Sequence, residues 1–309
     1  MTTQLLPADG RGTVVTVGTF DGVHLGHRQV LEEIARRART SGRRSLLVTF
    51  EPHPLEIVNP QAAPALLTLA TERREILAQC ELDIVVFLAF TRELSRLTPR
   101  EFLELLRERF DLQELVLGHD HGFGRGRAGN VTLVRELGRS MGFGVDVVDE
   151  VEVEGRVVSS TLIRRAIAGG DLVTAAVQLG RPYSCIGTVV PGAGRGRALG
   201  YPTVNIAIGD GRKLLPPIGV YAVHVEWSRG SGGGMMHLGP RPTFNDASLS
   251  LEAHVFTPVG QMYGEAIKLS WLARLRDVAR FDSPEALKRQ LDNDFAVAKG
   301  LVDSIRGHG

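Results

Sequence analysis

Cysteine is scarce in this chain. Cys80 and Cys185 are the two cysteines among 309 residues, and they lie far apart in the sequence. Small secreted scaffolds depend on several cysteines for their disulfides, so that class is excluded. The scarcity is typical of a reducing compartment, and we expect the protein in the cytoplasm.

An excess of charge of one sign is also lacking, because 36 Lys and Arg residues stand against 35 Asp and Glu residues. A net charge of +1 provides no general attraction for nucleic acid or an anionic membrane. The longest apolar run, near residues 84–90, is too short to cross a bilayer, and the first residues carry no secretion-signal pattern. We therefore expect neither a nucleic acid nor a membrane partner, whereas local sites for small anions remain possible.

The first part of the chain alternates strand-like and helical patterns. Hydrophobic residues make up 43% of the chain, enough for one large domain or two ordinary ones. Strands are predicted at Thr13–Val17, Ser45–Phe50, Ile84–Ala89, Glu114–Leu117 and Val145–Val148, with helices from about His24, near Thr71–Gln79, at Pro99–Phe110 and at Val131–Met141. This alternation predicts an α/β domain with a parallel, Rossmann-like sheet.

The last part of the chain has a different pattern. Strands are predicted at Tyr183–Val190, Gly219–Trp227, Met235–Leu238, Leu249–Phe256 and Ala266–Trp271, with no helix between them. They predict an antiparallel barrel or sandwich, closed by a helix that starts at Ser283-Pro284-Glu285. After two short helices starting near Ser160 and Asp171, we place the boundary between domains 1–181 and 182–309. The run SRGSGGG at 228–234 is interpreted as a flexible hairpin tip.

Two histidines follow the first predicted strand. His24 and His27 stand at the expected start of a helix, where backbone N–H groups have no partner within the helix and the helix dipole favours phosphate oxygens. Gly26, between them, has no Cβ and allows a ligand to approach the backbone. With Gly18, Phe20 and Asp21 of the same turn, these residues predict a nucleoside triphosphate site.

Other interpretations of the two histidines remain. Metal binding by helical histidines usually has i, i+4 spacing and further ligands nearby, which this turn lacks. The histidines could also simply cap a surface helix. The order of strand, glycine turn and helix favours phosphate binding.

A second short motif lies at 159–164. Ser159 or Ser160 can cap a helix whose first turn exposes N–H groups and the Thr161 hydroxyl, and Arg164 lies one turn further, within reach of a phosphate. Without the histidine motif this pattern would indicate only a helix start.

Together with the loop GHDHGFGRGRAGN at 118–130, these motifs resemble the bacterial bifunctional riboflavin kinase and FMN adenylyltransferase family. The resemblance runs nearly end to end. It implies that His24 and His27 stabilise ATP phosphates, that the 159–164 motif contacts the triphosphate, and that Asp120 is the acidic residue of the family's loop. His121-Gly122 replaces the aromatic-arginine pair often seen there, a departure that concerns flavin contacts.

The second predicted domain carries a glycine-rich loop at 192–197. Gly192, Gly194 and the side chains of Arg195 and Arg197 can contact phosphates, but no Gly-Lys-Ser/Thr follows, so this is not a P-loop. Thr203 and Asn205 alternate on one strand face and offer two oxygens suited to Mg²⁺. The resemblance identifies Pro202–Asn205 with the Pro-Thr-Ala-Asn signature of riboflavin kinases, with Val204 in place of Ala. A plain hairpin is the alternative interpretation.

Glu252 lies mid-strand, with His254 on the same strand face. From the pattern alone, an exposed surface pair is favoured over a catalytic base. The resemblance reverses this preference, since Glu is the family's base and Gly239–Phe244 matches the motif that precedes it. His237 stands where the family commonly has Asn.

The resemblance implies an enzyme that phosphorylates riboflavin to FMN with ATP and Mg²⁺, and then adenylylates FMN with a second ATP to give FAD and pyrophosphate. Class I aminoacyl-tRNA synthetases share the histidine signature, but their K-M-S-K-S loop and a basic RNA-binding surface are lacking here. A non-catalytic flavin or nucleotide sensor, or a nucleotidylyltransferase with a single activity, remain as alternatives. The sequence does not indicate the oligomeric state.

Overall fold

Runs rich in β-branched and aliphatic residues form a parallel sheet in the first part of the chain. The computed structural model of the protein describes residues 10–118, 131–153, 155–192, 194–240, 249–257, 260 and 262–306. The strands of this sheet are β1 (Thr13–Val17), β2 (Arg44–Glu51), β3 (Ile84–Ala89), β4 (Leu112–Gly118) and β5 (Gly144–Val148). Their order is β3-β2-β1-β4-β5, and each neighbouring pair is parallel.

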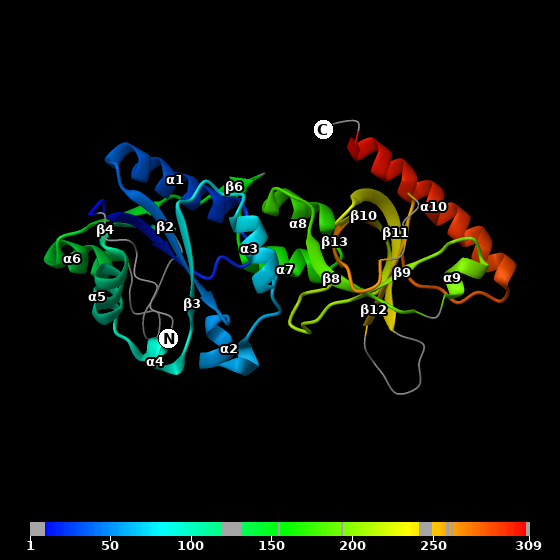
Figure 1. Ribbon diagram of the computed structural model, residues 1–309, viewed down its shortest axis with the longest axis horizontal. Helices are drawn as coiled ribbons and strands as arrows, with labels where there is room; N and C mark the ends of the chain where they lie inside the picture. The colour runs from blue at the N-terminus through cyan, green and yellow to red at the C-terminus, as the bar shows by residue number, and fades with distance from the viewer. Residues whose placement is uncertain are drawn as a thin grey trace. The chain divides into compact units, whose positions relative to one another are not determined.

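Helices cover both faces of this sheet (Figure 1). The helical elements of this part of the chain are α1 (Leu25–Ser41), α2 (Pro54–Val58), the 3-10 turn η1 (Pro60–Ala62), α3 (Ala70–Leu77), α4 (Arg92–Arg96), α5 (Pro99–Phe110) and α6 (Val131–Met141). Val15 and Val17 of β1 pack with α5 and α6, whereas Val14 points the other way and packs with α1 and α3. Alternate strand residues thus serve two cores, as a sheet buried on both faces requires.

Local signals set the ends of the helices. Thr98 caps α5 and accepts a hydrogen bond from the Glu101 backbone, while the Glu101 side chain accepts one from the Thr98 backbone. At the end of α1, Gly42 takes the left-handed conformation with φ 67°. These signals explain why the sequence prediction found the positions of the larger helices.

A closed antiparallel barrel follows. Its strands are β8 (Ser184–Val190), β9 (Val204–Ala207), β10 (Gly219–Trp227), β11 (Gly230–Pro240), β12 (Leu249–Val255) and β13 (Ala266–Arg276), in the order β10-β11-β12-β9-β8-β13. The remaining elements are the pair β6 (Glu152–Val153) and β7 (Arg156–Val157), with α7 (Ser160–Ala168), α8 (Leu172–Leu179), α9 (Arg195–Ala198) and α10 (Pro284–Arg306). Helix α10 packs across β10, β11 and β13 (Figure 1). The predicted fold class is confirmed.

Two details of the prediction are wrong. The glycines of 228–234 are not a flexible tip, because the turn is Ser228-Arg229 and β11 already begins at Gly230. A Cβ on Gly233 would lie 2.4 Å from Val302 of α10, so glycine is needed where the helix packs closely on the strand. The barrel strands also have a helix between them, the single turn α9, which follows Gly194 in the left-handed conformation.

The chain divides into two compact units, Met1–Ala65 with Arg73–Ser160, and Leu66–Glu72 with Thr161–Gly309. A buried ion pair explains why a short early segment belongs to the second unit. Lys213 donates to Glu72 at 2.6 Å and to the carbonyls of Leu67 and Ser184 at 2.7 Å, and both charged side chains are at most 4% exposed. Each of its three donors has a partner, as burial of an ammonium group requires.

Candidate active sites

The turn after β1 has an unusual backbone. Phe20 and Val23 have positive φ angles of 48° and 40°, which are rare for residues other than glycine and costly for a β-branched one. Both side chains are buried, at 4% and 0% exposed, so packing holds the turn in this conformation. Residues 18–24 therefore form a rigid connection at the carboxyl end of β1.

This turn lies where ligands bind in doubly wound sheets. Strand β1 has β2 on one side and β4 on the other, and the chain leaves β1 toward β2 through α1. The strand order reverses between β1 and β4, and ligands of such sheets bind at the carboxyl ends of the strands on either side of that point.

His24 and His27 meet face to face at the start of α1. Their rings stack with centroids 3.6 Å apart and an angle of 16° between the ring planes. His24 is the N-cap, since its Nδ1 accepts a hydrogen bond from the His27 backbone N–H at 3.3 Å. Sequence reasoning put both histidines on the helix, but α1 begins after His24. A neutral His24 that accepts at Nδ1 carries its proton on Nε2, so this nitrogen is a hydrogen-bond donor.

Gly26 and Phe20 complete the surroundings of the two rings. A Cβ on Gly26 would lie 3.3 Å from Cε1 and Nδ1 of His24, tighter than an ordinary contact, so glycine leaves room for the ring stack. The Phe20 ring lies 4.6 Å from the His27 ring, centroid to centroid. Gly18 directly follows β1 and donates its N–H to the Val48 carbonyl.

The start of α7 is hydrogen-bonded to the same turn. The Ser160 hydroxyl donates to the Asp21 carbonyl at 3.0 Å, across 139 residues of sequence. Ser159 precedes the helix, Thr161 lies in its first turn, and Arg164 follows one turn from the start. Asp120 lies outside the described residues, as do His121-Gly122.

Arg73 is a buried residue of this region that sequence reasoning missed. Only 2% exposed, it donates to the Thr19 carbonyl at 3.1 Å, to the Phe50 carbonyl at 2.7 Å and to Glu51 at 2.7 Å. Burial lowers the pKa of Arg73, and the charges of Glu51 and Asp21 oppose that effect. Arg73 thus links the carboxyl ends of β1 and β2 and fixes the residue before Phe20. No local signal identifies it, because Glu72-Arg73-Arg74 reads like a solvated helix face.

In the barrel, residues predicted for one site lie on neighbouring segments. Glu252 on β12 is directly opposite Asn205 on β9, and directly opposite residues of antiparallel strands share a face. A Cβ on Gly192 would lie 1.9 Å from Nδ2 of Asn205, so the glycine loop passes directly over that amide. A Cβ on Gly196 would lie 3.3 Å from Cγ2 of Thr203, which places Thr203 against the same loop.

The rest of the glycine loop leads into α9, and Glu252 has polar neighbours on β12 and β11. Gly194 precedes α9 with φ 68°, Arg197 is exposed on α9, and the Arg195 side chain lies outside the described residues. The Ser250 hydroxyl donates to Glu252 at 3.3 Å. On its other side, Glu252 pairs with His237 of β11. Burial lowers the pKa of His237, and the negative charge of Glu252 opposes that effect.

The oxygens of this face fit Mg²⁺. Thr203 and Asn205 are neutral oxygen donors beside one carboxylate, and Mg²⁺ is usually held by one or two protein groups together with substrate phosphates and water. Within the described part of the chain, no group of three or more His, Cys, Asp and Glu residues could hold a metal by itself.

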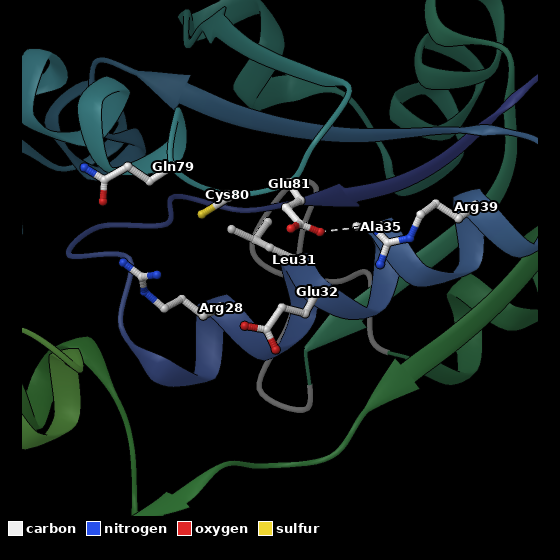
Figure 2. Close-up of a pocket in the computed structure, with 8 residues that line it drawn as sticks. All are labelled: Arg28, Leu31, Glu32, Ala35, Arg39, Gln79, Cys80 and Glu81. Carbon is white, nitrogen blue, oxygen red and sulfur yellow. Dashed lines mark hydrogen bonds and ion pairs between the residues drawn. The ribbon is translucent and has the colours of Figure 1, made fainter.

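A cavity of about 360 Å³ lies elsewhere, beside α1. Arg28 and Glu32 line it from the helix, and Gln79 and Cys80 line it from the segment after α3 (Figure 2). None of the predicted site residues lines this cavity, which has charges of both signs. In the part of the chain that the structure describes, no helix is long and apolar enough to cross a membrane.

Sequence comparisons agree with this geometry in both parts of the chain. Residues 6–162 match the family model described as FAD synthetase, and residues 179–302 match that described as riboflavin kinase. A protein from Pseudomonas fluorescens described as a bifunctional riboflavin kinase/FMN adenylyltransferase is 38% identical over 300 residues, covering 96% of this chain and 95% of the relative. Relatives with the same description are 35% identical in Escherichia coli K12, with 96% and 95% coverage, and 34% identical in Listeria monocytogenes, with 91% and 90% coverage.

A solved structure is also similar along the whole length. It is a protein from Streptococcus pneumoniae described as a macrolide-efflux protein, with a TM-score of 0.86, 30% identity and 96% of each chain covered. The parallel sheet, the barrel and both sequence matches lead to one conclusion. The chain belongs to the family of bifunctional riboflavin kinases/FMN adenylyltransferases.

Proposed function

We propose that this chain makes FAD from riboflavin in two steps, with one site in the barrel domain 182–309 and one in the α/β domain 1–181. The observation that supports this assignment best is the barrel face on which Glu252 pairs with Asn205 under the Gly192 loop. That face combines a carboxylate, two neutral oxygens and a backbone loop able to contact phosphates. The α/β domain presents hydrogen-bond donors at the helix N-terminus of its histidine turn.

In the barrel domain, riboflavin is phosphorylated. Glu252 accepts the proton of the riboflavin 5′-hydroxyl as that oxygen bonds to the γ-phosphorus of ATP, and ADP leaves. Gly192, Gly194, Arg195 and Arg197 hold the phosphates. Thr203 and Asn205 would hold Mg²⁺, which when bound neutralises phosphate charge. The product is FMN.

In the α/β domain, an oxygen of the FMN phosphate bonds to the α-phosphorus of a second ATP, and pyrophosphate leaves. The phosphate is already anionic near neutral pH, so no protein base is needed. The residues instead orient two anions and stabilise the charge that develops between them. His24, with its proton on Nε2, His27 and Arg164 donate to that charge, and Ser159, Ser160 and Thr161 add the start of α7.

We place the enzyme in the cytoplasm, with no nucleic acid or membrane as a partner. Cys80 and Cys185, both in the described part of the chain, form no disulfide, and burial raises the pKa of the Cys185 thiol to about 12, which keeps it in the unreactive protonated form.

Product chromatography after incubation with riboflavin, ATP and Mg²⁺ tests the function. We expect FMN and then FAD, and addition of EDTA is expected to stop both reactions. A protein that binds flavin but forms neither product would be the sensor of the alternative interpretation. FAD formed from added FMN, without FMN formed from riboflavin, would leave only the nucleotidylyltransferase.

A further inference from the structure

His254 lies on β12 two residues after Glu252, on the same strand face. Its Nδ1 is 2.8 Å from the Pro202 carbonyl oxygen. Because a carbonyl oxygen only accepts hydrogen bonds, Nδ1 carries the proton and donates. Nδ1 therefore forms a hydrogen bond with the backbone of the segment that precedes β9.

Aromatic rings fix the orientation of His254. Tyr201 lies edge-on to it, with ring centroids 5.2 Å apart, and Phe256 and Phe295 lie at 6.1 and 6.2 Å. The Tyr201 hydroxyl donates to Asp292 on α10, which holds Tyr201 in turn. The imidazole thus has one well-defined direction toward Pro202.

The bonded carbonyl belongs to the residue before Thr203. In the register of β12 with β9, Glu252 is opposite Asn205 and Ala253 is opposite Val204, so His254 and Thr203 are the residues next to the last pair of the ladder. On the other side, a Cβ on Gly196 would lie 2.2 Å from the Tyr201 carbonyl oxygen. The Tyr201–Thr203 segment is thus held between the glycine loop and His254.

We propose that His254 is a positioning residue of the riboflavin kinase site, which fixes the Thr203 hydroxyl through the Pro202 carbonyl. The inference rests on the proposed function, in which Thr203 and Asn205 would hold Mg²⁺. Asn205 is part of the β9 ladder, but Thr203 precedes the strand and depends on other contacts for its position. His254 supplies such a contact through the Pro202 carbonyl.

Two substitutions separate this role from a general structural one. In His254→Asn the amide nitrogen occupies the position of Nδ1 and can still donate to Pro202, whereas in His254→Gln it reaches the position of Nε2 and cannot. Phe256→Leu is the matched control, because it loosens the same aromatic cluster and leaves the hydrogen bond in place. Adenylylation of added FMN serves as an internal control in the same samples.

We expect His254→Asn to keep the Mg²⁺ dependence of FMN formation. His254→Gln is expected to raise the Mg²⁺ concentration for half-maximal rate by about tenfold, the usual effect of one lost hydrogen bond, with little change in the KM for riboflavin. Adenylylation of added FMN stays unchanged in every variant. Phe256→Leu is expected to lower the thermal midpoint without changing the Mg²⁺ dependence.

A binding measurement gives a readout without turnover. Mn²⁺ is titrated into each variant in the presence of ADP, and the free ion is followed by electron paramagnetic resonance. The Gln variant is expected to bind Mn²⁺ more weakly than wild type and the Asn variant, and ¹⁵N NMR of the imidazole is expected to show the proton on Nδ1 in wild type.

The proposal is overturned if Asn and Gln variants bind Mn²⁺ equally well. It is also overturned if Phe256→Leu weakens Mn²⁺ binding as much as His254→Gln, because the cluster would then act only through stability. A wild-type protein that binds Mn²⁺ with ADP but forms no FMN contradicts the proposed function instead, and the binding comparison still judges the role of His254.

Discussion

At the scale of single residues, capping and phosphate binding by His24 are compatible. The cap uses Nδ1, and this hydrogen bond leaves the proton on Nε2, where a phosphate can accept it. The two interpretations of the histidine motif therefore describe the two nitrogens of one ring. The capping hydrogen bond also orients the His24 ring, which in this position stacks on the His27 ring.

Because the two ring nitrogens of His24 have different roles, we expect that substitutions can change the adenylylation rate without changing the stability that the cap provides. Asn is among the best N-cap residues, so His24→Asn should preserve stability, whereas His24→Ala should lower the free energy of unfolding by about 1 kcal/mol. Both variants lose the Nε2 donor, and we expect FAD formation from added FMN to fall by about 10²- to 10³-fold in each. Urea denaturation and the adenylylation rate measure the two effects. An Asn variant that kept full activity would show that Nε2 makes no contact in the transition state.

A second prediction at this scale is that riboflavin phosphorylation requires glycine at position 192. Its missing Cβ would lie 1.9 Å from the Asn205 amide, so Gly192→Ala must displace either the loop or Asn205. We expect riboflavin phosphorylation to fall by at least about tenfold, with adenylylation unchanged. Gly209→Ala is the matched control, because a Cβ there meets nothing within 4 Å. Equal kinase rates in both variants would argue against a role of Asn205.

Sequence reasoning predicted candidate site residues of the barrel but not their partners. Strand alternation alone predicts that Glu252 and His254 share a face, because the period of a strand is two. The register of β12 with β9 and β11 decides which residues lie opposite Glu252 and His254. Pairing between segments distant in the sequence sets this register. The burial of Arg73 was not predicted either. Its partners are carbonyl groups at the ends of β1 and β2, far from its own helix in the sequence.

At the scale of elements, a charge cluster ties α1 to the edge of the parallel sheet. Arg37 on α1 pairs with Glu33 at 2.6 Å, with Glu114 of β4 at 2.6 Å and with Asp146 of β5 at 2.5 Å. Hydrogen bonds from Arg36 and Arg37 lower the pKa of Glu33 from its ordinary value of 4.5 to about 2. The cluster is partly exposed, so salt screens it and its contribution is moderate.

The lowered pKa predicts acid sensitivity with a definite sign. A carboxyl group with a lower pKa in the folded state stabilises the fold above its unfolded pKa and loses this effect as pH falls through the folded value. The stability difference between wild type and Glu33→Gln should be constant above about pH 5 and shrink between pH 4.5 and about 2. Urea denaturation at a series of pH values measures it. A constant difference for Glu33→Gln down to pH 2 would contradict the pairing.

At the scale of the whole molecule, the two compact units differ from the sequence division 1–181 and 182–309 at Leu66–Glu72 and at residues 161–181, which all belong to the second unit. Sequence reasoning divides the chain into two consecutive blocks, because the change from alternating helices and strands to successive strands is visible in the pattern. The assignment of Leu66–Glu72 to the second unit is not visible, since it depends on Lys213, 141 residues away from Glu72. The parallel sheet and the barrel were predictable because each repeats its own period many times.

Separate sets of proposed phosphate ligands in domains 1–181 and 182–309 predict that the two activities fail independently. Glu252→Ala removes the proposed base and should abolish FMN formation from riboflavin, while FAD formation from added FMN continues. His27→Ala removes a donor at the start of α1 and should slow FAD formation by about 10²- to 10³-fold, so that FMN accumulates. Measuring both steps in both variants gives four rates, and thermal denaturation checks that each variant is folded. Loss of adenylylation in folded Glu252→Ala, or of riboflavin phosphorylation in folded His27→Ala, would show that one reaction needs residues of both domains. Independent failure would instead mean that the Gly192 loop and the His24 cap each orient their own ATP.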